Sequence, residues 1–216
     1  MFFGHIVIFY LSCSLQQSPV EGRGRSRREG GFTLMEVLMV IAVSAILSVI
    51  AWAGLNSLLP AYRLKIAAGD LYANLQRAKQ EAIRINGECA VYFDIPAGRY
   101  HLVSGGPDGI CNGPPFGNPP VAKNDDVLLN HISLSNYGSG VSYGSGAAAV
   151  SVPGAHIPPA VRVSYGNNWV RFDARGMARE MGYAYLTNNT GMAFAVGTPS
   201  LAGSVVLKKW AGNGWE

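Results

Sequence analysis

Residues 30–59 read GGFTLMEVLMVIAVSAILSVIAWAGLNSLL, and this stretch decides the architecture of the chain. A basic run ends at Gly31 and an apolar segment begins at Phe32, with no charged residue from Val37 to Leu59. At about 1.5 Å of rise per residue, a helix of that length spans a hydrocarbon core of about 30 Å. The segment therefore predicts a transmembrane helix, and the competing interpretation is the buried core helix of a soluble protein.

Glu36 is the ionisable residue in the first turns of this helix. A carboxylate at the bilayer centre costs about 2.5–3.5 kcal/mol on insertion scales. An amine from a neighbouring helix offsets that cost, and the low dielectric strengthens the pair. We expect Glu36 to fix the position of an incoming subunit. The alternative is a carboxylate that reaches headgroup water near the helix end.

The residues before the helix predict a leader and an orientation. Residues 1–12 are apolar but too short to span a bilayer, and they precede the basic block, which is the wrong order for a secretory signal. A start codon assigned too far upstream, with a true start such as Val20, is the competing explanation. The basic residues predict a cytoplasmic N-terminal side; they are Arg23, Arg25, Arg27 and Arg28.

The string GGFTLMEVL before an apolar run resembles the class III signal of type IV prepilins and pseudopilins. The resemblance implies that a prepilin peptidase cuts between Gly31 and Phe32 and that the new amine of Phe32 is methylated. It also assigns Glu36 the role of the glutamate that guides assembly.

Beyond the apolar segment, Pro60 is expected to end or kink the helix. A second helical half follows over residues 60–87, with apolar residues at alternating steps of four and three; they are Leu64, Ala68, Leu71, Leu75, Ala78 and Ala82. This stripe predicts packing against a β-sheet of the same chain. Asn86-Gly87 is expected to form the left-handed end of the helix.

The segment from Asp70 to Asp94 carries a second resemblance. It is similar to the helix-to-first-strand segment of the GspH/FimT family, through Ala78, Lys79, Glu81, Ala82, Ile83 and Asn86. Lys79 stands where the family more often has arginine. The resemblance implies a minor pseudopilin of the type II secretion system or a minor type IV pilin.

Residues 88–216 read as a β-domain with glycine, proline or asparagine between its strands. Strands are expected at 88–94, 99–105, 126–135, 161–166, 168–174, 181–188, 192–198 and 204–210. The first two predict a hairpin. The low-complexity segment 135–150 is expected to be a loop or a weak edge strand.

Cys89 and Cys111 lie in the expected exported domain, whereas Cys13 lies in the leader. A disulfide between Cys89 and Cys111 would stabilise the fold by about 2–4 kcal/mol if its geometry is unstrained. Two unpaired cysteines are the alternative.

Charge and motif content narrow the function classes. The net charge is +4, and removing the four arginines and two glutamates of residues 1–31 leaves +2, so nucleic-acid binding would need a local patch. The candidates for contact with DNA or a partner are Arg171, Arg175, Arg179, Lys208, Lys209 and Trp210. Solvated strand faces are the alternative. No metal spacing, catalytic motif or cofactor fingerprint occurs, so we expect neither an enzyme nor a cofactor.

Together these patterns predict an α+β, type IV pilin-like chain: a long N-terminal helix packed on a C-terminal antiparallel β-sheet domain. The expected parts are a leader over 1–31, a transmembrane assembly half-helix over 32–59, an amphipathic half-helix over 60–87 and a periplasmic β-domain over 88–216. The chain is expected in the bacterial inner membrane, with other pseudopilins or pilins and the prepilin peptidase as partners. The leading function is a minor pseudopilin, and the alternative is a minor pilin that primes pilus assembly or takes up DNA.

Overall fold

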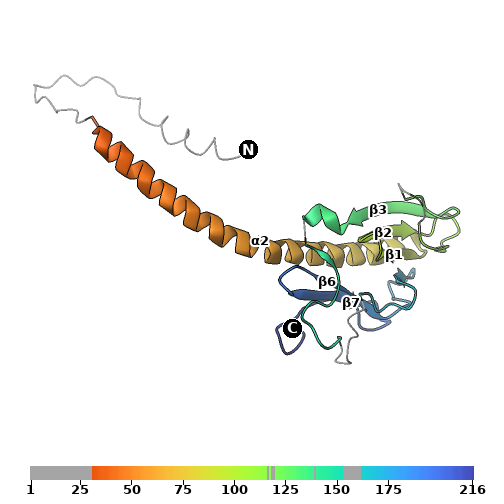
Figure 1. Ribbon diagram of the computed structural model, residues 1–216. Helices are drawn as coiled ribbons and strands as arrows, with labels where there is room; N and C mark the ends of the chain where they lie inside the picture. The colour runs from red at the N-terminus through yellow and green to blue at the C-terminus, as the bar shows by residue number, and fades with distance from the viewer. Residues whose placement is uncertain (1–30, 116, 118–119, 139, 153–161) are drawn as a thin grey trace, which may run out of the picture. The chain divides into compact units, whose positions relative to one another are not determined.

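The computed structural model describes residues 31–115, 117, 120–138, 140–152 and 162–216. The expected leader and Cys13 lie outside these ranges, apart from Gly31. The chain divides into two compact units, Met1–Ile46 and Leu47–Glu216, and the helix α2 (Leu34–Ile85) belongs to both. Figure 1 shows this helix and the strands that follow it.

Thr33 caps the start of α2. The backbone amide of Glu36 donates to Thr33 Oγ1 at 3.2 Å, and the amide of Val37 donates to the Thr33 carbonyl at 3.2 Å. Thr33 and Glu36 also have the spacing of a capping box, in which an acid at the third helical position complements the helix N-terminus. The helix N-terminus itself therefore favours an acid at position 36, whether or not a second subunit pairs with it.

α2 does not end at Pro60, in contrast to one of the two outcomes expected from the sequence. It continues as α-helix from Leu34 to Ile85 with Pro60 inside. Proline removes one backbone hydrogen bond from a helix interior. The turns after Pro60 are held by tertiary packing, because Leu64, Ala68 and Leu71 are fully buried.

The end of α2 is the left-handed one expected from the sequence. Asn86 has a φ of 52°, its amide donates to the Ile83 carbonyl at 3.3 Å, and the amide of Gly87 donates to the Ala82 carbonyl at 3.1 Å. This pair of bonds is a Schellman motif, which satisfies the last helical carbonyls and turns the chain into the first strand.

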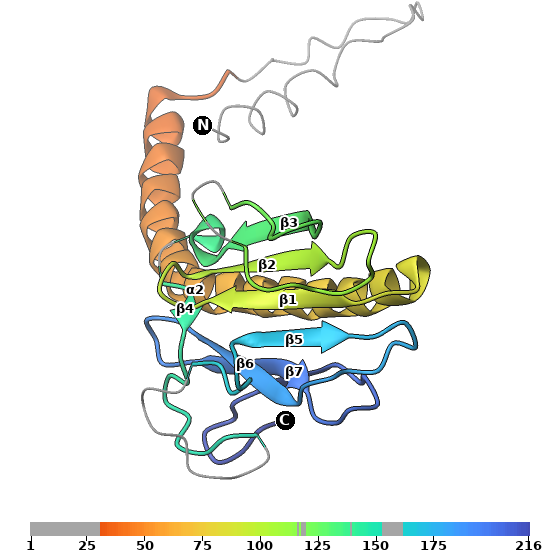
Figure 2. The same cartoon turned by 90° about the vertical axis from the view of Figure 1, so that its right-hand side faces the viewer.

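The first sheet has the strand order β3-β2-β1-β5, and all its pairs are antiparallel. Its strands are β1 (Cys89–Asp94), β2 (Arg99–Ser104), β3 (Val127–Ser133) and β5 (Trp169–Phe172). The expected β1–β2 hairpin is confirmed, with Asp94 opposite Arg99. Figure 2 shows these strands side by side along the second half of α2.

The second sheet has the order β4-β6-β7-β8 and is also antiparallel. Its strands are β4 (Ser142–Tyr143), β6 (Gly182–Thr187), β7 (Ala193–Thr198) and β8 (Val206–Lys209). The low-complexity segment forms a 3-10 turn, η1 (Leu134–Tyr137), and the short edge strand β4. The strand expected at 161–166 is wrong for its described residues, since Val163 forms only an isolated bridge to Ala184.

One hydrophobic core joins the second half of α2 to both sheets. The predicted stripe is confirmed, because all six of its residues are fully buried; they are Leu64, Ala68, Leu71, Leu75, Ala78 and Ala82. They share a cluster with Val91, Leu102 and Val170 of the first sheet and with Leu186, Phe194 and Val196 of the second. The fold is therefore α+β, with a long N-terminal helix packed on an antiparallel β-domain.

Candidate functional site

The N-terminal part of α2 presents an apolar surface that nothing in the described chain covers. A membrane-length window of this helix has a mean hydropathy of 2.5 and is 0% buried. Phe32 is 82% exposed, and large apolar side chains remain exposed as far as Leu58. Soluble monomers rarely leave a continuous apolar patch of this kind in water, so the surface needs a membrane or other helices around it. By length and composition, α2 can cross a membrane.

Glu36 lies on this apolar surface. It is exposed, and it is the one ionisable side chain between Phe32 and Tyr62. Together with Phe32, Val37, Val40 and Ile41 it lines a shallow groove on the helix. The lining of the groove is apolar, so Glu36 contributes only the apolar part of its side chain to it, a few residues from the expected cleavage position after Gly31.

Two of the three arginines of the sequence-predicted patch, Arg171 and Arg179, are paired with acids of the same chain. Arg171 on β5 binds Glu180 through its Nη2 at 2.5 Å and its Nε at 2.9 Å, and its guanidinium lies 4.1 Å from the centroid of the Trp169 ring. Burial lowers the pKa of Arg171, but the hydrogen bond to Glu180 and the charges of Glu180 and Glu88 together outweigh it, so the net shift is upward. Arg171 therefore links β5 to Glu180 and stabilises the fold, and the paired acid largely neutralises its charge.

Arg179 is held by a second acid, Glu88, at the start of β1. The Arg179 Nη2 lies 3.0 Å from Glu88 Oε1, and the other Glu88 oxygen accepts the backbone amide of Cys111 at 3.2 Å. Arg171 approaches the same carboxylate at 3.8 Å. Glu88 is 6% exposed, so one buried acid ties β5, the turn after it and the Cys111 loop together.

The other predicted patch residues make none of these ion pairs, although Arg175 lines the same pocket as Arg179 and Glu88. Arg175 is exposed on the turn after β5. Lys208 and Lys209 lie on β8 of the second sheet, and the Trp210 ring packs edge-on against Trp215 at 5.4 Å. The structure thus separates the six residues into two sets on different sheets.

The expected disulfide is absent from the structure, in which Cys89 and Cys111 are both free and buried. Cys89 packs in the main core beneath the first sheet, whereas Cys111 packs with Ala90 and Tyr92 in a separate cluster. Successive strand residues point to opposite faces, so Cys89 and Ala90 lie on different sides of β1. Burial raises the pKa of Cys89 to about 12 and raises that of Cys111 above its ordinary value as well.

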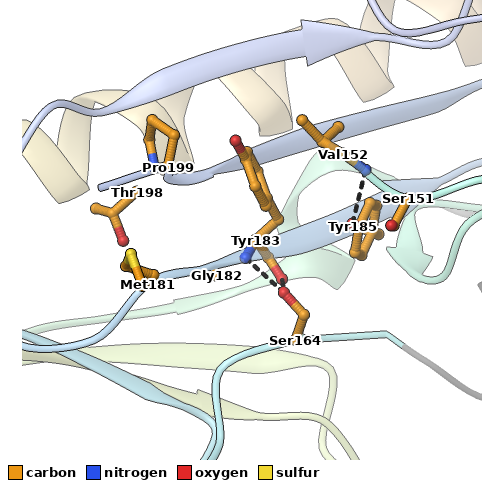
Figure 3. A pocket seen from close by; sticks show the side chains of 9 residues that line it. All are labelled: Ser151, Val152, Ser164, Met181, Gly182, Tyr183, Tyr185, Thr198 and Pro199. Carbon is orange, nitrogen blue, oxygen red and sulfur yellow. Dashed lines mark hydrogen bonds between the residues drawn. The ribbon is translucent and has the colours of Figure 1, made fainter. Parts of the chain in front are cut away.

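A pocket beside β6 is lined by tyrosines and small polar groups (Figure 3). The Tyr183 amide donates to Ser164 Oγ at 2.8 Å, and the Val152 amide donates to the Tyr185 hydroxyl at 3.3 Å. Burial raises the pKa of both tyrosines. The lining holds no histidine, cysteine or acid that could activate a nucleophile. Among the described residues no group of three metal-ligating side chains occurs either.

Several partners found in the structure were not expected from the sequence. Glu88 and Glu180 lie 83 and 9 residues from Arg171 respectively, and only the fold brings all three together. The Thr33 cap of α2, in contrast, carries a sequence signal, because Thr33 and Glu36 have the spacing of a capping box.

Comparison with known proteins adds one family match. The family model of the prokaryotic N-terminal methylation motif matches residues 26–52. No curated protein matches the chain. Among solved structures, the chain is similar to the minor pseudopilin EpsH from the type 2 secretion system of Vibrio cholerae, with 14% identity and a TM-score of 0.42. That alignment covers 67% of this chain and 95% of the other.

The methylation motif coincides with the start of the exposed apolar helix. Together with the antiparallel β-domain packed on the second half of that helix, it supports a type IV pilin-like protein.

Proposed function

We propose that this chain is a minor pseudopilin of the type II secretion system, a structural subunit of the short periplasmic pseudopilus that drives protein export. The observation that carries the proposal is the placement of a single carboxylate, Glu36, on an uncovered apolar helix that also carries the methylation motif. The resemblance of residues 70–94 to the GspH/FimT family favours the minor pseudopilin class.

Processing comes first in this proposal. A prepilin peptidase cuts between Gly31 and Phe32, and the amine of Phe32 is methylated. Cleavage there would remove every residue before the apolar helix and create a cationic amine four residues from Glu36. The helix then lies in the inner membrane, with its N-terminus on the cytoplasmic side and residues 88–216 in the periplasm.

Assembly follows from two properties of the helix surface. Its apolar side chains can leave lipid for the helices of other subunits, where small residues such as Ala42 and Ala45 allow close approach. Glu36 is costly in lipid, by about 2.5–3.5 kcal/mol near the bilayer centre. Pairing with the Phe32 amine of a neighbouring subunit removes much of that cost at one axial register. The carboxylate therefore selects the position at which a subunit enters the filament.

The alternative is a minor pilin of a type IV pilus that primes pilus assembly. The methylation motif fits this function equally well. DNA uptake finds less support, because Arg171 and Arg179 are paired with Glu180 and Glu88. Genes beside the coding sequence would separate a secretion system from a pilus.

The test of the proposal is the N-terminal residue and the intact mass of the chain extracted from membranes. The expected chain begins at Phe32 and carries one extra methyl group. A strain without active prepilin peptidase is the control and should yield a longer, unmethylated chain. A chain from the wild-type strain that begins anywhere other than Phe32 would refute the processing step.

A further inference from the structure

Two histidines face each other across the β2–β3 pair of the first sheet, whose strands Figure 2 shows side by side. His101 on β2 and His131 on β3 are directly opposite in the register of this antiparallel pair, so their side chains lie on the same face of the sheet. The ring centroids are 6.5 Å apart and the ring planes are inclined by 25°. The irregularity in the register lies between Leu102 and Val103, beyond the histidines. These are the two histidines in the described part of the chain.

The phase of the backbone pairing brings the two side chains close together. The amide of Leu134 donates to the Gly98 carbonyl at 2.9 Å, so these opposed residues form a hydrogen-bonded pair. Hydrogen-bonded and non-hydrogen-bonded pairs alternate along an antiparallel ladder, so His101 and His131, three residues further along, form a non-hydrogen-bonded pair. In pairs of this kind the Cα atoms are about 4.5 Å apart and the side chains approach more closely than in the other kind.

The surroundings leave both rings available to a ligand. His101 is 3% exposed, yet its buried Nδ1 has no hydrogen-bond partner among the described residues. A buried histidine with a purely structural role normally uses its ring nitrogens in hydrogen bonds. His131 is exposed, so its ring can turn and an ion can reach the pair from solvent. The charged neighbours of His101 are Arg99 and Asp94, which offset each other in an ion pair at 2.8 Å.

Two adjacent imidazoles form a chelating pair for a late first-row metal ion. Imidazole nitrogen suits divalent copper, nickel and zinc, and copper binds most tightly in that series. Each ring nitrogen lies about 2.0–2.1 Å from the ion in histidine complexes of zinc, so two rings that share one ion have centroids about 5–6 Å apart. A small rotation of the exposed His131 ring brings the observed separation of 6.5 Å into this range.

The cysteines of the described chain are poor competitors for such an ion. Cys89 and Cys111 are buried, and burial raises the pKa of both thiols, that of Cys89 to about 12. They are therefore protonated at neutral pH, whereas the thiolate is the form that binds metals. Among the described residues no third metal-ligating side chain joins the two histidines, so water would complete the coordination.

We infer that His101 and His131 bind one divalent ion of the late first-row transition metals, each through one ring nitrogen, with Cu²⁺ bound most tightly. The ion would tie β3, at the edge of the first sheet, to β2. An ion that binds only the folded chain stabilises it. This site is additional to the proposed function and does not rest on it.

The test is a titration of the full chain with Cu²⁺ near neutral pH, followed by electron paramagnetic resonance. The chain is purified in detergent without a polyhistidine tag. We expect one bound ion with hyperfine coupling to two imidazole nitrogens. His131→Ala and His101→Ala should each lower the affinity at least about tenfold, because the loss of even an outer-shell partner typically costs 10–100-fold. His156→Ala is the matched control, since it removes a histidine outside the described residues and should bind Cu²⁺ as the wild type does.

Thermal unfolding gives a second readout. Saturating Cu²⁺ should raise the Tm of the wild type and of His156→Ala but not that of His131→Ala, and EDTA should reverse the rise. Without metal, His131→Ala should keep the wild-type Tm, because the side chain that it removes is exposed. If its Tm falls, His131→Asn replaces it.

Coupling to a single imidazole nitrogen in the wild type would overturn the inference. An equal affinity and an equal rise in Tm for the wild type and His131→Ala would overturn it as well. Neither measurement depends on cleavage or on filament assembly, so a negative result would leave the proposed function untouched.

Discussion

Arg171→Ala tests whether the contacts of Arg171 on β5 stabilise the fold or whether its charge is available to bind a ligand. The substitution removes two hydrogen bonds to Glu180, the approach to Glu88 and the contact with the Trp169 ring. The Arg171 and Glu180 side chains are 24% and 20% exposed, so water replaces the lost contacts only in part.

The expected loss follows from these contacts. Hydrogen bonds to charged groups contribute about 1.5–3 kcal/mol, and a cation over an aromatic ring contributes about 0.5–1 kcal/mol where it is partly solvated. Allowing for residual exposure, we expect Arg171→Ala to lower the free energy of unfolding by about 3 kcal/mol. For a domain of this size that corresponds to a fall in Tm of about 6–12 °C.

The assay is thermal unfolding of the full chain in detergent, followed by far-ultraviolet circular dichroism. Arg175→Ala is the matched control, because it removes the same charge from an exposed position and should change stability by less than about 0.5 kcal/mol. Equal Tm values for Arg171→Ala, Arg175→Ala and the wild type would refute the claim that the contacts of Arg171 stabilise the fold.

Leu71→Ala should lower the free energy of unfolding by about 3–5 kcal/mol in urea titrations, because Leu71 is fully buried between α2 and the sheets; a loss below 1 kcal/mol would contradict that packing. Burial raises the pKa of Cys89 from 9.0 to about 12, so its neutral thiol stabilises the fold below pH 9 and that contribution is lost as the pH rises from about 9 to about 12. The Tm of the wild type should therefore fall more steeply than that of Cys89→Ala over this range; parallel curves would contradict the assignment. Finally, single-stranded DNA should not be retarded by the full chain in a gel at low salt, and retardation abolished by Lys208→Ala and Lys209→Ala would restore the DNA-contact prediction for β8.

The helix stripe and the first hairpin were predictable because their signals are local. Steps of three and four along α2 identified the residues that the sheets bury, and Asn86-Gly87 identified the helix end. Pro60 was harder to interpret, because its effect depends on packing that lies further along the chain. The turns after Pro60 remain helical since the stripe from Leu64 onward is anchored in the core.

The roles of the arginines and cysteines could not be read from the sequence. Arg171 meets Glu88 only because β1 and β5 are neighbours in the first sheet. Cys89 and Cys111 pack in clusters on opposite sides of β1. Which face of the sheet the Cys89 side chain points to depends on the register of β1, and the spacing of the two cysteines in the sequence does not reveal it. Local patterns therefore located the long apolar helix well, whereas the charge clusters required the three-dimensional pairing of β1 and β5.

The central claim is that the charge of Glu36 governs entry of the subunit into a filament, and Glu36→Gln tests it most directly. The backbone amide at position 36 still donates to Thr33 Oγ1 in Glu36→Gln, and glutamine suits this position of a helix start as glutamate does, so the start of α2 should be unchanged while the charge is lost. The measurement is incorporation of the subunit into filaments sheared or purified from cells, with Glu36→Asp as the variant that retains the charge. The account predicts that Glu36→Gln reaches the membrane in normal amounts but is lost from filaments, and that Glu36→Asp is incorporated at least in part. Normal incorporation of Glu36→Gln would contradict the account.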